Sequence, residues 1–155
     1  MDARNAGTGS PTGVRWVRME RRLDASAERV FRAWSDPEEL ARWLPPRIEG
    51  GLAAGARTVL VWPRARVWWD VAEVHPSDTF VFHRPWGPDE DVVTTVRVTV
   101  QRVGYGSRVI LEDGPFPIDT PHGLDAWAAS IATWSEALTL LRAQLDFSVD
   151  ARPSR

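Results

Sequence analysis

The chain has 155 residues, of which 43% are hydrophobic and 26% are charged, and its formal net charge is −2. These values are typical of one globular domain that can bury a core without disulfides or metals. The small negative charge gives no electrostatic basis for nucleic-acid binding. The absence of cysteine excludes disulfides, thiolate metal sites and a cysteine nucleophile. All 19 basic side chains are arginine, so Schiff-base chemistry and a P-loop lysine are also excluded.

The two ends of the chain differ in composition from the rest. Residues 1–13 contain no apolar segment of the signal-peptide type, and no stretch approaches 18 consecutive apolar residues. We therefore expect a cytoplasmic protein that does not enter a membrane. Because residues 1–13 and about 148–155 are rich in small, polar and charged residues, we expect disordered tails there, flanking a single domain at 14–147.

The folded part is predicted to begin with a strand at Val14–Leu23, followed by two short helices within residues 25–46. The first helix has one apolar stripe with the spacing i, i+3, i+4 and i+7, formed by Ala27, Val30, Phe31 and Trp34. Ser26 is expected to cap this helix. Asp36 and Pro37 are expected to begin the second helix, which two consecutive prolines then end.

Short strands separated by turn residues are predicted next. Their ranges are 47–52, 57–62, 66–74, 79–85, 92–103 and 107–113. The strand at 92–103 alternates valine with polar residues, which indicates an antiparallel sheet with one buried face and one wet face.

After a predicted loop at 114–121, a long helix closes the chain. It is indicated by apolar residues at steps of three and four, namely Leu124, Trp127, Ile131, Trp134, Leu138, Leu141 and Leu145. Such a seam is also compatible with a coiled-coil dimer. We expect the helix to lie across its own sheet, because no other long helix is available to cover the apolar face.

Four stretches resemble one family of proteins. They are residues 25–43, residues 71–82, residues 96–109 and residues 134–145. They are similar to the first helices, the central hairpins and the closing helix of the START/Bet v1-like (SRPBCC) helix-grip superfamily. The similarity is greatest to the branch named after activators of the Hsp90 ATPase, also called polyketide cyclase-like. Bulkier residues stand where that branch often has glycine, at Ala54, Trp69 and Thr133.

The resemblance implies an α+β helix-grip fold. In this fold an antiparallel sheet of six to seven strands wraps around a long C-terminal helix, and two short helices lie between the first two strands. It further implies that the protein binds or sequesters a hydrophobic, aromatic small molecule between helix and sheet. We expect this in natural-product biosynthesis or in self-resistance to an antibiotic of the polyketide or enediyne type.

Two other functions remain open at this point. A polyketide cyclase or aromatase-like enzyme would need polar side chains such as Asp70, Arg84 and Glu112 to converge in the cavity. An Hsp90 co-chaperone-like module would need a large exposed patch and a protein partner. The expected partner is a hydrophobic small molecule, with no nucleic acid and no membrane, and the chain is expected to be a monomer or a homodimer.

Nine tryptophans provide the main material for a binding site. An aromatic concavity suits a flat ligand, and it equally suits a core filled by its own rings. The adjacent Trp68 and Trp69 must point to opposite faces of their strand. The candidate ligand-binding residues are Trp43, Trp69, Phe80, Phe82, Arg84, Trp86, Phe116, Trp127 and Ile131.

Arg84 is the one charged residue among these candidates. It shares strand parity with Phe80 and Phe82, so it is expected to point inward, where it could meet a carboxylate or phenolate of a ligand. The alternative is an ordinary ion pair with Asp70 or Glu112. No catalytic residue, metal site or cofactor is predicted, since the three histidines lack the spacing of metal ligands.

Overall fold

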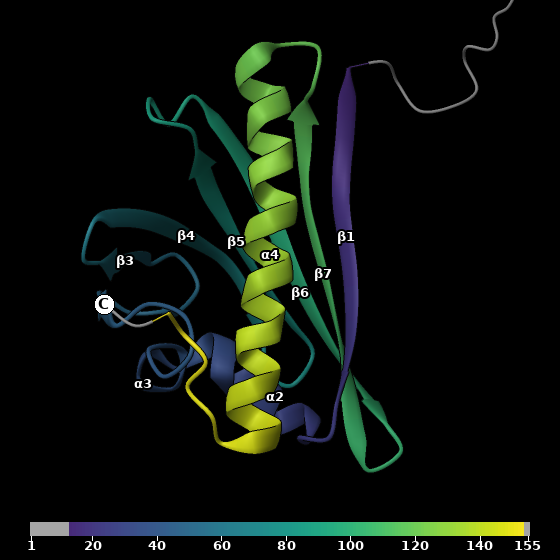
Figure 1. The fold of residues 1–155 in the computed structure, drawn as a ribbon. Helices are drawn as coiled ribbons and strands as arrows, with labels where there is room; N and C mark the ends of the chain where they lie inside the picture. The colour runs from purple at the N-terminus through teal and green to yellow at the C-terminus, as the bar shows by residue number, and fades with distance from the viewer. Residues whose placement is uncertain (1–12, 154–155) are drawn as a thin grey trace, which may run out of the picture.

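The computed structural model describes residues 13–153, so all but the last residue of the tail expected at residues 1–13 lies outside the described residues. Seven antiparallel strands form one sheet in the order β1-β7-β6-β5-β4-β3-β2, and a long helix lies across it (Figure 1). The elements are β1 (Val14–Leu23), α2 (Ala27–Ser35), α3 (Pro37–Leu40), β2 (Arg47–Glu49), β3 (Arg57–Trp62), β4 (Ala65–His75), β5 (Thr79–Trp86), β6 (Val92–Val103), β7 (Gly106–Pro117) and α4 (Pro121–Phe147). The predicted α+β helix-grip fold is confirmed.

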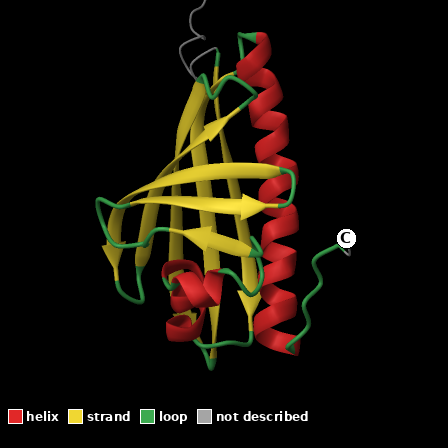
Figure 2. Cartoon of the chain, turned by 90° about the vertical axis from the view of Figure 1, so that its left-hand side faces the viewer, coloured by secondary structure: helices red, strands yellow, loops and turns green. Residues whose placement is uncertain are grey.

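The helix pair α2–α3 forms as its local sequence predicts. The Ser26 hydroxyl accepts a hydrogen bond from the backbone N–H of Arg29, and the Asp36 carboxylate accepts one from the N–H of Glu38. The indole N–H of Trp43 then donates to the carbonyl of Ala33 at 3.0 Å, which ties the end of the pair back to α2. The pair packs beside the lower part of the sheet, next to the last turns of α4 (Figure 2).

Strand β7 continues to Pro117, although the sequence predicted a loop from residue 114. The reason is a long-range partner, because β1 pairs with this extension through Val14 and Pro117 and through Arg15 and Phe116. The last pair of β7 with β6 joins Thr95 and Gly114. Beyond that pair β7 has a neighbour on one side only, which is where a strand tolerates residues without an N–H.

The first half of α4 presents a different face to the sheet from the one predicted. Leu124 and Ile131 are 46% and 39% exposed, and the small residues Gly123, Ala126 and Ser130 are buried instead. At Gly123 a side chain would collide with the carbonyl of Pro117. Small residues therefore let the helix approach a part of the sheet that already carries bulky rings.

Residues 148–153, where the composition predicted disorder, lie against the end of the helix pair. The guanidinium of Arg152 donates to the carbonyls of Ala41 and Pro45 at 2.9 and 3.2 Å, and it forms an ion pair with Asp150 at 2.8 Å. This C-terminal segment therefore adds a wall beside α4. No helix in the described range 13–153 is long and apolar enough to cross a membrane.

A hydrogen bond between side chains joins the start of α4 to the loop after β5. His122 Nδ1 lies 2.7 Å from Asp91 Oδ2. This hydrogen bond and the charge of Asp91 raise the pKa of His122 above its ordinary 6.5, and the same bond lowers the pKa of Asp91. The contribution of His122 to stability is thus complete below 6.5 and is lost as the pH rises through its raised pKa.

We expect NMR titration of the His122 ring protons to give a midpoint above 6.5. In Asp91→Asn the midpoint should return toward the ordinary value, because the variant removes the hydrogen bond and the charge that raise the pKa of His122. An unchanged His122 midpoint in the variant would contradict the pairing.

Candidate functional site

Aromatic rings pack directly on one another in the centre of the domain, between α4, the helix pair and the sheet. Trp69 stacks on Phe82 with ring centroids 3.9 Å apart, and Trp34 contacts Trp43 at 4.9 Å and Trp134 at 6.3 Å. All five rings are at most 1% exposed. These rings occupy the region between helix and sheet in which a ligand was expected.

Trp86 extends this cluster toward the N-terminal half of α4. The sequence places it at the edge of a polar loop, but it is the last residue of β5 and is 5% exposed. Its ring contacts Phe116 at 5.9 Å and Trp134 at 6.5 Å. Trp86 is therefore part of the core, and it supports the charged residue two positions before it.

Arg84 points inward from β5, as its parity predicted. Its guanidinium lies 3.5 Å from the ring centroid of Trp86 and 5.8 Å from that of Trp134, which are cation–π distances. The guanidinium donates a hydrogen bond to the carbonyl of Pro85 at 2.8 Å. The expected alternative of an ion pair with Asp70 or Glu112 is not observed, since no carboxylate oxygen in the described chain lies within 4.0 Å of it.

A buried carboxylate, Asp113, lies behind the two indoles that hold Arg84. One of its oxygens accepts from the Thr94 hydroxyl at 2.5 Å, and the other accepts from Ser130 at 2.7 Å and from the Trp134 indole at 2.8 Å. The Trp86 indole donates to Thr94 at 2.9 Å. Each indole therefore has its face toward the guanidinium and its N–H bonded toward the carboxylate.

The pKa values of Arg84 and Asp113 follow from the surroundings of the two side chains. Burial lowers the pKa of Arg84 to about 10, although the charge of Asp113 opposes this effect. Burial also raises the pKa of Asp113, against the combined effect of its three hydrogen-bond donors and of Arg84. Asp113 was not singled out from the sequence. Its parity with the buried Val109 and Leu111 on β7 was the signal that could have identified it.

A pocket of 350 Å³ opens beside Arg84, between the β3–β4 hairpin, α4 and the C-terminal segment. Its walls are mainly apolar, with charged groups at Arg84, Glu136 and Arg152. The lining residues are Leu44, Trp62, Ala65, Val67, Arg84, Thr133, Glu136, Ala137, Leu140, Arg152 and Pro153. We call this space the hairpin–helix pocket.

The predicted site residues divide into three groups relative to this pocket. Arg84 lines it. Six others are buried in the aromatic core, namely Trp43, Trp69, Phe80, Phe82, Trp86 and Phe116. Trp127 and Ile131 lie on α4 outside the lining, half-buried and 39% exposed respectively. The lining residues on the β3–β4 hairpin and in the C-terminal segment were not predicted, because their approach depends on long-range contacts.

The polar residues that a cyclase would need do not converge at the pocket. Asp70 forms a two-bond ion pair with Arg57 at 2.7 and 2.8 Å, and hydrogen bonding from Arg57 lowers its pKa. Neither Asp70 nor Glu112 lines the pocket. Trp68 lies on the same face as this pair, with the Arg57 guanidinium 4.3 Å from its ring, while Trp69 is 1% exposed. The two adjacent tryptophans thus point to opposite faces, as predicted.

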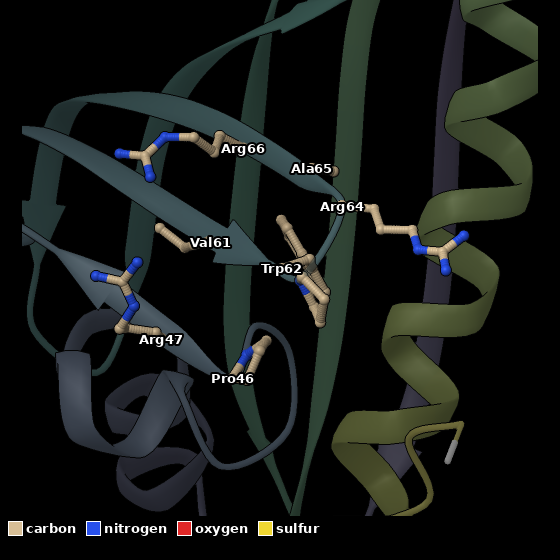
Figure 3. A pocket seen from close by; sticks show the side chains of 8 residues that line it. Pro46, Arg47, Val61, Trp62, Arg64, Ala65 and Arg66 are labelled. Carbon is tan, nitrogen blue, oxygen red and sulfur yellow. The ribbon is translucent and has the colours of Figure 1, made fainter. Parts of the chain in front are cut away.

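A larger depression of 810 Å³ lies on the outside of the β3–β4 hairpin (Figure 3). It is open to solvent, and two of its arginines, Arg47 and Arg66, already donate to the carboxylate of Glu49 at 2.5 and 2.7 Å. Trp62 lines both this depression and the hairpin–helix pocket. We take the smaller space as the candidate site, since it is more enclosed and its cation, Arg84, is half-buried on an indole, whereas Arg64 in the larger depression is exposed. Within residues 13–153 no three metal-binding side chains are grouped to hold an ion.

A seven-stranded antiparallel sheet that carries a long C-terminal helix, with a small pocket at its margin, defines a helix-grip protein. Within that class, the chain belongs to the activator of Hsp90 ATPase homolog 1-like protein family, whose model matches residues 24–146. This confirms the superfamily that the sequence resembles. The search of curated proteins found no match.

Solved structures show the same fold at low sequence identity. Protein MLL2253 from Mesorhizobium loti is 22% identical with a TM-score of 0.75, over 87% of this chain and 99% of its own. DynU16, a protein in the dynemicin biosynthetic locus, is 21% identical with a TM-score of 0.75, over 92% of this chain and 51% of its own. The Aha1 dimer from Colwellia psychrerythraea is 16% identical with a TM-score of 0.72, over 86% of this chain and 97% of its own.

Proposed function

We propose that this protein binds a hydrophobic, aromatic small molecule in the hairpin–helix pocket and sequesters it in natural-product biosynthesis or antibiotic self-resistance. The observation that carries the proposal is the pocket itself. Its volume of 350 Å³ is at the lower end of the range of about 300–1,000 Å³ for small-molecule sites. Apolar side chains of Leu44, Val67 and Leu140 line it, and Trp62 offers an indole at one side.

The similarity to DynU16 supports the biosynthetic context, since that protein belongs to a natural-product locus. Because Asp70 and Glu112 lie away from the pocket, binding has more structural support than a cyclase reaction. The family name and the Aha1 neighbour keep a co-chaperone-like interaction as the competing hypothesis. That hypothesis predicts an Hsp90-type ATPase as partner and no dependence on the pocket.

A tryptophan fluorescence titration with hydroxyanthraquinones, as models of aromatic polyketides, tests the proposal. We expect saturable quenching, because Trp62 lines the pocket and Trp86 and Trp134 lie directly behind Arg84. The matched control is Thr133→Phe, which fills the pocket from the half-buried side of α4 and leaves the core rings in place. Equal quenching in both proteins, or none in either, would contradict binding at this pocket.

A further inference from the structure

Arg84 differs from the other charged residues of the pocket in what surrounds it. Its guanidinium is held between the face of Trp86 and the more distant face of Trp134, and the hydrogen bond to Pro85 uses one of its five N–H donors. Within the described residues no carboxylate is paired with it. A planar guanidinium that is stacked on one face and has donors left on its rim is suited to bind a carboxylate or a phenolate.

The buried Asp113 does not take the place of such a partner. Its two oxygens already accept three hydrogen bonds, from Thr94, Ser130 and Trp134. The carboxylate acts on Arg84 through space. It accepts directly from the Trp134 indole, and it holds Thr94, whose hydroxyl oxygen accepts from the Trp86 indole. Asp113 therefore orients Arg84 and leaves the donors at the pocket wall for another acceptor.

The other charges at the pocket leave the region around Arg84 positive. Arg152 is half-buried and is neutralised by Asp150 at 2.8 Å. Glu136 is exposed on α4, where water and salt screen its charge. The guanidinium of Arg84 is half-buried and partly desolvated without a contacting anion, which costs free energy, and an anionic ligand group would offset that cost.

Resting on the proposed function, we propose that the ligand carries an acidic group, a carboxylate or an ionised phenol or enol, attached to its aromatic part. The acidic oxygens accept the free N–H donors of Arg84, and the aromatic part lies against Trp62 and the apolar walls of the pocket. Arg84 thus determines which hydrophobic molecules bind, while Trp86, Trp134 and Asp113 position it.

A pair of fluorescent probes separates binding through Arg84 from binding through the apolar walls of the pocket. 1-Anilinonaphthalene-8-sulfonate carries an anionic group, and N-phenyl-1-naphthylamine has the same aromatic skeleton without it. We expect the wild-type protein to bind the sulfonate more tightly. In Arg84→Met, which keeps an apolar stem over Trp86, the sulfonate should bind about tenfold or more weakly, because a charge-assisted hydrogen bond is lost. The neutral probe should be unaffected within about twofold, which also reports that the variant is folded.

Two controls make the outcomes distinct. Arg64→Met removes the same charge from the exposed tip of the β3–β4 hairpin (Figure 3) and should leave both affinities unchanged. Thr133→Phe should weaken both probes. Suppose that Thr133→Phe weakens binding of the neutral probe, so that the pocket is the binding site. If the wild-type protein then binds the sulfonate no more tightly than the neutral probe, or if Arg84→Met still binds the sulfonate more tightly, the acidic-ligand inference is overturned and the proposed pocket stands. If neither probe depends on Thr133, the proposed function itself fails.

Discussion

Replacing Trp134 with alanine is expected to lower the free energy of unfolding by about 3–5 kcal/mol. The side chain is 1% exposed and contacts the rings of Trp34, Phe82 and Trp86. Its indole N–H also supplies one of the three hydrogen bonds to Asp113. The substitution therefore leaves a cavity at the junction of α2, α4 and β5 and removes a donor from a buried carboxylate. Urea unfolding followed by circular dichroism measures the change.

The matched control for this prediction is Trp127→Ala. Trp127 is the same residue type on the same helix, but it is half-buried and no acceptor for its N–H is found. Trp127→Ala should therefore lower the free energy of unfolding clearly less than Trp134→Ala. Equal losses in the two variants would show that the packing around Trp134 is not the centre of the core.

Asp113→Ala is expected to have a comparable effect, on the order of 3–5 kcal/mol. It leaves the hydroxyls of Thr94 and Ser130 and the indole of Trp134 without their acceptor, and it removes the negative charge that stabilises the charged form of Arg84. Asp113→Asn should be milder, since an amide oxygen can still accept from Ser130 and Trp134 while the amide nitrogen donates to Thr94. The same unfolding measurement compares the two variants.

The control for the Asp113 variants is Asp70→Asn, which removes an exposed partner of Arg57 and should change stability little. The pH dependence adds a second check. Because burial raises the pKa of Asp113, its ionisation disfavours the folded state, and stability is lost as the pH rises through the raised value. This loss of stability with rising pH should be absent in Asp113→Asn, because the amide does not ionise. An Asn variant as unstable as the Ala variant would contradict the hydrogen-bond assignment.

Local signals predicted the elements that depend on neighbours in sequence. The caps at Ser26 and Asp36, the apolar stripe of α2 and the inward parity of Arg84 all follow from a few adjacent residues. The opposite directions of Trp68 and Trp69 follow from the strand period of two in the same way. These features are confirmed because nothing distant competes with them.

The features that sequence reasoning missed all depend on distant partners. β7 extends past residue 113 because β1 is there to pair with it. Ser130 faces the sheet in place of Ile131 because bulky rings leave room only for small residues in that half of α4. Alternation alone places Asp113 inward, but the groups that donate hydrogen bonds to it come from β6 and α4, so its role appears only in three dimensions.

The order of the strands also has a consequence for how the domain is assembled. Strands β2 to β6 each pair with the next strand along the chain, so these hairpins can form from short loops. β1 pairs with β7, although all the other strands and the helix pair lie between these two strands in the sequence. Such a closure is entropically unfavourable until the intervening chain is compact, and non-local pairing of this kind slows folding. The strands that line the hairpin–helix pocket thus pair locally along the chain. The opposite edge of the sheet is completed by one long-range event, the pairing of β1 with β7.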